Sequence, residues 1–260
     1  MKELLKGINS LAMSGVRDAD LGQVVMEVVP GRATASGSLS AEELCSLAWS
    51  FCALELHSDK LFRAVFRALE DASVVAGNTL CELYEIHLTL KGFHQSSYSA
   101  YELEDATVKS LGDHYKKHKG GRKYKMERSS ERLHSQIADA LDEVVEGSVT
   151  TGFQTSLGFA VDIAVTKRKG SSSAPLVCLD IDGPHTLIRS LDPVENQVLG
   201  MMGRARGAVT LKRRVLQKHG FHLLAISEDQ WRAMDGEVNR KALLRSILVQ
   251  AGVSSDRIRA

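Results

Sequence analysis

The sequence predicts a region of α-helical hairpin repeats followed by an α/β domain. Two observations lead to this fold class. Up to Leu90, apolar residues recur at helical spacing and the pattern repeats itself, whereas after Gly147 several short segments have the composition of strands. The chain of 260 residues, 43% of them apolar, is long enough for one large domain or two modest ones. We expect helical repeats over 1–92, a basic linker or arm over 93–129, and the α/β domain over 130–260.

The N-terminal region repeats itself at an offset of 40 residues. Glu3 to Leu21 aligns with Glu43 to Leu61, and apolar residues recur at matching positions. This period is typical of solenoids built from helical hairpins. A degenerate third unit is expected to begin at Leu80. Because stacked hairpins bury their faces only against a neighbour, we expect this array to pack on the C-terminal domain, on another protein or on RNA.

Local signals define the ends of the helices in the second unit. Ser40 can cap the helix that starts at Ala41, with Glu43 completing a capping box. Ser58 can cap the next helix. The composition of residues 30–38 predicts a loop between the first two units. Three further side chains on or near the apolar faces are interpreted as core or groove-edge residues: Trp49, Tyr84 and His87.

The segment from Lys109 to Arg128 is densely basic in a chain whose net charge is only +1. Its cations alternate with Tyr115 and Tyr124, and Gly120–Gly121 interrupts any long helix. One interpretation is a solvated, flexible linker. The other is an arm that lies along phosphates and stacks bases on tyrosine, and we favour it because so dense a run is not easily explained by solubility.

The C-terminal domain begins with a helix over residues 130–145, whose apolar face contains Leu133, Ile137 and Leu141. The remaining elements are expected in the order strand, strand, helix, strand, helix, which predicts a small mixed sheet flanked by helices. Their expected ranges are 158–166, 176–181, 207–219, 221–226 and 239–250, with a loop over 167–175. Gly220 is placed to end the helix over 207–219.

Several classes of protein are not indicated. The near-neutral charge argues against a globally basic RNA-binding protein, so any nucleic-acid surface must arise from local charge segregation. No apolar run approaches the roughly 18 to 20 residues of a membrane helix. The first residues lack the apolar segment of a secretory signal. None of the four cysteines forms a CxxC pair, and they are expected to be small buried apolar groups in a reducing compartment.

Three motifs follow one another between Val177 and Met234: L-D-I-D-G-P-H, then T-L-K-R-R-V-L-Q-K-H-G-F, then a strand leading to E-D-Q-W. In this order they resemble the RAP domain, a module of organellar RNA-processing and ribosome-associated proteins. The resemblance implies a restriction-endonuclease-like core, helical repeats upstream, and RNA binding in a mitochondrion or plastid. His185 follows Pro184 directly, whereas the family commonly has another residue between them, so no role is transferred to His185.

Nucleases of this fold place one acidic residue on an early strand and a D/E-x-K motif on the next, and the carboxylates hold a divalent metal. The degenerate candidates here are Asp162, Asp180 and Asp182, with Lys212 as a substitute for the missing lysine. Competing interpretations make Asp182 a turn residue and pair Asp162 with Arg213 or another base. We expect no catalytic residue, no metal and no cofactor.

The sequence therefore predicts a non-catalytic RNA-binding protein, a component of the mitochondrial ribosome that contacts rRNA through its backbone and shape. The alternatives are a metal-dependent endoribonuclease or RNA-processing factor, and a protein-binding scaffold that uses the helical repeats. Expected partners are RNA and neighbouring proteins of a ribonucleoprotein, without a membrane, and the mitochondrion is favoured over the plastid. The expected RNA-binding residues are Lys116, Lys117, Lys119, Arg122, Lys123, Lys125, Arg204, Arg206, Lys212, Arg213 and Arg214.

Overall fold

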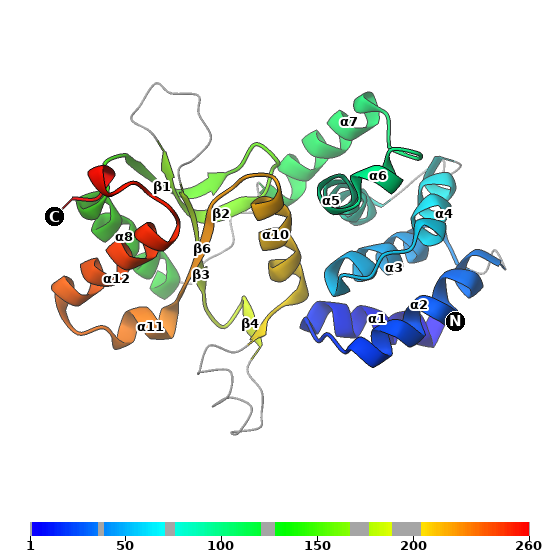
Figure 1. Cartoon of the computed structure of the whole chain (residues 1–260), viewed down its shortest axis with the longest axis horizontal. Coiled ribbons are helices and arrows are strands. Elements are labelled where there is room, and N and C mark those ends of the chain that lie inside the picture. The colour runs from blue at the N-terminus through cyan, green and yellow to red at the C-terminus, as the bar shows by residue number, and fades with distance from the viewer. Residues whose placement is uncertain are drawn as a thin grey trace. The chain divides into compact units, whose positions relative to one another are not determined.

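The computed structural model describes residues 2–35, 39–70, 76–120, 128–166, 177–188 and 204–259. The chain divides into two compact units (Figure 1). Unit 1 comprises Met1–Lys119 together with Arg204–Val215, and unit 2 comprises Gly120–Gly203 together with Leu216–Ala260. Each unit therefore contains two separate stretches of sequence.

Unit 1 is a stack of helices, as the repeat predicted. Helices α1, α3 and α5 pack side by side in that order, while α2 packs on α4 and α7 packs on α5. The helix pairs α1–α2 and α3–α4 correspond to the two aligned repeats, so each repeat contains two helices as predicted, and α3 packs on α4. The helices are α1 (Lys2–Ser14), α2 (Ala19–Ala35), α3 (Ala41–Leu54), α4 (Asp59–Glu70), α5 (Gly77–Phe93), α6 (Gln95–Tyr98) and α7 (Asp105–Tyr115).

The caps of the second hairpin are formed as predicted. The backbone N–H of Glu43 donates to Ser40 Oγ at 3.2 Å, and the N–H of Ser40 donates to Glu43 Oε2 at 3.0 Å. The N–H of Leu61 donates to Ser58 Oγ at 3.4 Å, which caps α4. The loop predicted over residues 30–38 is wrong in its first part, because α2 continues through Pro30 to Ala35. Residues 36–38 lie outside the described part of the chain.

Trp49, Tyr84 and His87 are buried in the core of unit 1, as expected. All four cysteines are buried as well. After α5 the chain does not continue as an extended linker. Residues 95–120 form α6, α7 and a π-helical turn, η1 (Lys116–Gly120), so the first half of the basic segment is helical.

The second stretch of unit 1 packs closely against the first hairpin. It contains the short strand β5 (Arg204–Ala205) and the start of α10 (Gly207–Lys218), a helix that begins in unit 1 and ends in unit 2. A Cβ atom on Gly207 would lie 1.6 Å from the carbonyl oxygen of Ala12, and one on Gly15 would lie 2.6 Å from that of Ala205. Only glycine permits these two approaches of backbone to backbone.

Unit 2 is built on a four-stranded sheet in the order β1-β2-β3-β6. The pairs β1–β2 and β2–β3 are antiparallel, whereas β3–β6 is parallel, so the sheet is mixed as predicted. The strands are β1 (Ser148–Gln154), β2 (Ala160–Thr166), β3 (Val177–Asp182), β6 (Leu223–Ser227) and the short β4 (Leu187–Ile188). Helices α8 (Arg128–Val144), α11 (Glu228–Ala233) and α12 (Gly236–Gln250) complete the unit.

One apolar core joins this sheet to its helices. Ile137 on α8, Ile163 on β2, Leu179 on β3 and Leu248 on α12 all belong to it, and Trp231 on α11 is 1% exposed. Figure 1 shows α8, α11 and α12 on the same side of the sheet. Side chains alternate between the two faces of a strand, so Asp180 lies on the face opposite to Leu179.

The prediction of the elements of unit 2 was incomplete. Strand β1 and helix α11 were not predicted, and helix α12 begins three residues earlier than expected, at Gly236. The helix over 130–145 begins at Arg128 and ends at Val144. Gly220 has φ +87°, and the N–H of Phe221 donates to the carbonyl of Leu216 at 3.0 Å, which confirms the predicted helix end. The loop predicted over 167–175 lies outside the described residues.

Within the described residues, no helix combines the length and the apolar composition that crossing a bilayer requires.

Candidate nucleic-acid interface

The basic segment begins on the last turns of the α7 helix and continues into η1. Lys109 on α7 and the consecutive pair Lys116 and Lys117 on η1 are exposed. Three further cations predicted to contact RNA, Arg122, Lys123 and Lys125, lie outside the described residues. The described part of this segment therefore presents two adjacent predicted RNA-binding lysines at the surface of unit 1.

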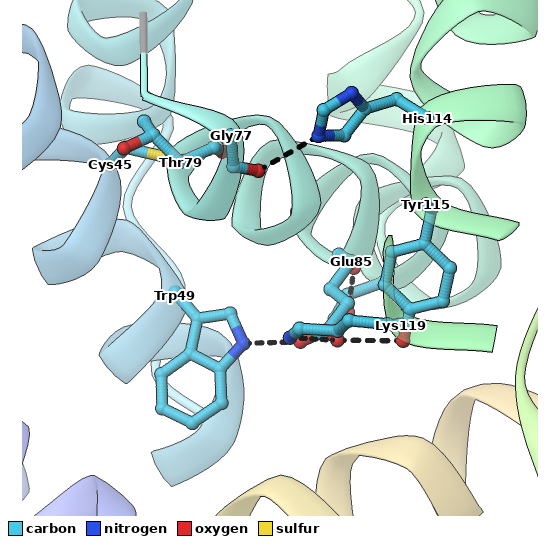
Figure 2. A network of polar contacts seen from close by, with 9 residues as sticks. Cys45, Trp49, Gly77, Thr79, Glu85, His114, Tyr115 and Lys119 are labelled. Atoms are coloured by element: carbon cyan, nitrogen blue, oxygen red, sulfur yellow. Dashed lines mark hydrogen bonds and ion pairs between the residues drawn. The ribbon is translucent and has the colours of Figure 1, made fainter. Parts of the chain in front are cut away.

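Lys119 has a different environment from its neighbours. Its Nζ lies 2.8 Å from Glu85 Oε1, and Glu85 is a buried residue of α5 (Figure 2). Tyr115 Oη donates to the same oxygen at 2.8 Å, and Trp49 Nε1 donates to Glu85 Oε2 at 2.5 Å. The Lys119 ammonium also lies 5.6 Å from the centre of the Tyr115 ring. The sequence predicted a phosphate contact for Lys119, but the structure places its ammonium on an internal carboxylate.

The carboxylate determines how its partners titrate. Burial lowers the pKa of Lys119, but the charge and the hydrogen bond of Glu85, together with Cys81 and Glu82, raise that pKa above its ordinary value. Burial, and then the negative charge of Glu85, hold the pKa of Tyr115 well above its usual range. At neutral pH the network consists of a charged lysine and a protonated tyrosine, both donating to one carboxylate.

The second predicted cluster lies on β5 and α10. Arg206 is exposed, while Lys212 and Arg213 are half-buried. Nothing is described for the side chain of Arg204, which lies on β5. Because Arg204–Val215 belongs to unit 1, its cations share a compact unit with Lys116, Lys117 and Lys119, even though some 90 residues separate the two groups in the sequence.

Arg214 was predicted to point outward with its basic neighbours, and this is wrong. Its Nε lies 2.9 Å from Glu55 Oε1, and its Nη1 donates to the carbonyl of Cys52 at 3.2 Å. The guanidinium carbon lies 5.0 Å from the centre of the Phe93 ring. Glu55 itself ends α3 with a left-handed φ of 62° and also pairs with Arg17. Arg214 therefore links α10 to the C-terminal end of α3 and does not extend into solvent.

The three acidic candidates lie on adjacent strands of unit 2. Asp162 is on β2, and its Oδ2 accepts from the N–H of Ile181 on β3 at 2.6 Å. Asp180 is 2% exposed, and Asp182 is the half-buried last residue of β3. The β2–β3 register pairs Ile163 with Leu179, so its continuation by one residue places Asp162 opposite Asp180.

The fit of these residues to a metal is limited. The described parts of the chain contain no group of three or more His, Cys, Asp or Glu side chains arranged to hold a metal ion. A buried histidine of α8, His134, lies near Asp162, and its Nδ1 is 4.0 Å from Asp162 Oδ1. Asp182 leads into a turn in which the N–H of Gly183 donates to Thr186 Oγ1 at 2.9 Å, as the turn interpretation predicted.

Two residues near these sites were not predicted from the sequence. Glu85 lies in an apolar helical run. From the sequence alone, an acidic residue at such a position cannot be distinguished from one on the solvent-exposed face of the helix. Glu228 directly follows β6, and a Cβ atom on Gly183 would lie 2.9 Å from its Oε2. The carboxyl ends of parallel neighbouring strands meet at one edge of a sheet, so a correct β3–β6 pairing would have indicated Glu228.

A scan against models of known families finds none that matches this chain, and a search of curated proteins finds no match either.

Proposed function

We propose that this protein binds RNA without cleaving it, through contacts between exposed lysines of unit 1 and the phosphate backbone. The observation that carries the proposal is the pair Lys116 and Lys117, exposed at the start of a densely basic segment. Arg206 is a further exposed cation in the same unit. Lysine contacts to phosphate are insensitive to sequence and give affinity that falls with salt.

The assignment to an organelle and to rRNA is a further part of the proposal. It is supported by the likeness of residues 177–234 to the RAP domain and by the two helix pairs, α1–α2 and α3–α4, upstream of a mixed sheet. We propose a restriction-endonuclease-like ancestry for unit 2 and a place in the mitochondrial ribosome. A short array of hairpins suits a fixed structural position better than the reading of a long sequence.

Crosslinking in cells tests this assignment directly. The tagged protein is crosslinked with ultraviolet light, and the attached RNA is sequenced. We expect enrichment of mitochondrial rRNA, and a matched variant with Lys116→Gln and Lys117→Gln should recover several-fold less RNA. A broad distribution over mitochondrial mRNA would favour a processing factor instead. Recovery of no RNA above an untagged control would contradict the proposal.

A second candidate function, a protein-binding scaffold, is favoured by the surface of the first hairpin. Leu4 on α1 and Leu21 and Val24 on α2 are exposed, with exposed fractions of 38%, 40% and 56%. Terminal units of helical arrays normally present a polar outer face. Affinity purification with and without ribonuclease separates the two candidates, since a scaffold retains its partners after RNA is digested.

A further inference from the structure

Glu85 collects donors from three elements of unit 1. Trp49 comes from α3, Tyr115 from the last turn of α7, and Lys119 from η1, while Glu85 itself lies in the middle of α5 (Figure 2). The side chain of Glu85 is only 8% exposed. A buried carboxylate is tolerated only where such donors satisfy it, so the arrangement of all three depends on the charge of Glu85.

This network includes two residues of the basic segment, Tyr115 and Lys119. Lys119 is three residues after Lys116 and two after Lys117, and all three lie on the same π-helical turn. A π-helix is intrinsically unfavourable and is usually found as a single turn. Glu85 accepts from Tyr115, which directly precedes that turn, and from Lys119 within it, so the turn is held on α5 while Lys116 and Lys117 between them are exposed.

We infer that Glu85 is a positioning residue of the RNA-binding surface: it fixes η1 on the helical repeats and so holds Lys116 and Lys117 at the surface, where phosphate can reach them. This inference rests on the proposed function. Glu85 itself makes no contact with RNA, and Lys119 acts through Glu85 rather than on phosphate. Groups held in place before binding lose less conformational entropy when the complex forms, so the network raises affinity without adding a contact.

The test compares Glu85→Gln, Tyr115→Phe and the wild-type chain. Glutamine keeps the shape of Glu85 but removes its charge, and phenylalanine keeps the ring of Tyr115 but removes one donor. Glu102→Gln is the matched control, because it breaks an ion pair with another residue of α5, Lys91, whose Nζ lies 2.9 Å from Glu102 Oε1 at the surface. Two quantities are measured for each: hydrogen exchange of the amides in residues 115–120, and affinity for a labelled RNA hairpin.

We expect Glu85→Gln to accelerate exchange in residues 115–120 and to weaken hairpin binding about three- to tenfold, the loss that ordering one or two side chains at binding produces. Tyr115→Phe should change both quantities in the same direction by less, and Glu102→Gln should change neither. If Glu85→Gln cannot be purified folded, Tyr115→Phe decides the matter through the same two readouts.

The outcomes separate the inference from the function on which it rests. Unchanged exchange, or faster exchange with unchanged affinity, in both network variants would overturn the positioning role while leaving RNA binding intact. Failure of the wild-type chain to bind the hairpin at low salt would instead remove the proposed function, and the role of Glu85 in RNA binding with it.

Discussion

Glu82 and Glu85 lie on the same helix, less than one turn apart, but their surroundings differ. Glu85 accepts from Trp49, Tyr115 and Lys119, whereas burial raises the pKa of Glu82 to about 7. Lys119 opposes that increase, and the negative charge of Glu85 adds to it. Burial therefore keeps Glu82 protonated into the neutral range, whereas three donors satisfy Glu85.

The replacement Glu82→Gln should stabilise the protein more at high pH than at low pH. The folded state holds a proton on Glu82 between its ordinary pKa of 4.5 and about 7, while the unfolded state does not. The wild-type chain therefore loses stability as pH rises through this window, and the loss is complete above about 7. Glutamine removes it, so urea unfolding should show about 2 kcal/mol more stabilisation by Glu82→Gln at pH 8 than at pH 4. An equal effect at both pH values would contradict the assignment.

The cysteine thiols should resist alkylation in the folded protein. Burial raises the pKa of Cys52 to about 12 and that of Cys45 well above its ordinary value, and Cys81 and Cys178 are also buried. Alkylation requires an exposed thiolate. Incubation with iodoacetamide at pH 7.5 followed by mass spectrometry should detect no adduct until urea is added. Rapid labelling of any one cysteine in the native chain would show that its environment is more open than described.

At the scale of elements, the sequence predicted what depends on neighbours in the chain. The capping box of Ser40 and Glu43, the cap at Ser58 and the helix end at Gly220 were predicted because each is satisfied within a few residues. β1 was missed because its sequence, S-V-T-T-G-F-Q, has few apolar residues and its central part is exposed. Pro30 was interpreted as a break, but α2 accommodates it within the helix.

In the candidate site, too, features that depend on neighbours in the chain were predicted, and features that depend on distant residues were not. Exposure of Lys116 and Lys117 agrees with a local reading of a basic run. The pairing of Lys119 with Glu85, and of Arg214 with Glu55, could not be predicted, because the partners are 34 and 159 residues away in the sequence. Whether a cation pairs with a carboxylate of a distant helix depends on tertiary packing, which residue spacing alone does not specify.

The approach of α10 to α1 gives a prediction for an element. Gly207→Ala places a methyl group on the carbonyl oxygen of Ala12 and should destabilise unit 1 by about 3 kcal/mol or more, since backbone must move. Gly7→Ala is the matched control, because a Cβ atom there meets nothing within 4 Å and alanine favours a helix by about 0.5–1 kcal/mol. Thermal unfolding of the two variants should shift in opposite directions. Equal shifts would mean that the α10 start does not pack on α1.

Asp162 joins β2 to β3 through its bond to the N–H of Ile181. Asp162→Ala removes this acceptor and should lower the free energy of unfolding by about 1–3 kcal/mol, with no added metal present. Chemical denaturation with and without Mg²⁺ measures the effect. Stabilisation of the wild-type chain by Mg²⁺ that is lost in Asp162→Ala would favour the nuclease alternative over a purely structural role.

At the scale of the whole molecule, the division into units differs from the order of the sequence. The stretch Arg204–Val215, whose motif was assigned with the C-terminal domain, belongs to unit 1 together with the helical repeats. The cations of this stretch thereby share one compact unit with Lys116 and Lys117, and a fragment that ends near residue 129 would lack the second cluster. The proposed RNA-binding surface therefore requires the full chain.

The salt dependence of RNA affinity tests the central claim most directly. The dissociation constant for a labelled RNA hairpin is measured from low to physiological salt for the wild-type chain and for the double variant Lys116→Gln, Lys117→Gln. We predict that the wild-type affinity falls steeply with salt and that the variant binds more weakly, with a slope reduced by about one for each lysine removed. The same affinity and the same slope in both proteins would contradict backbone recognition through these lysines.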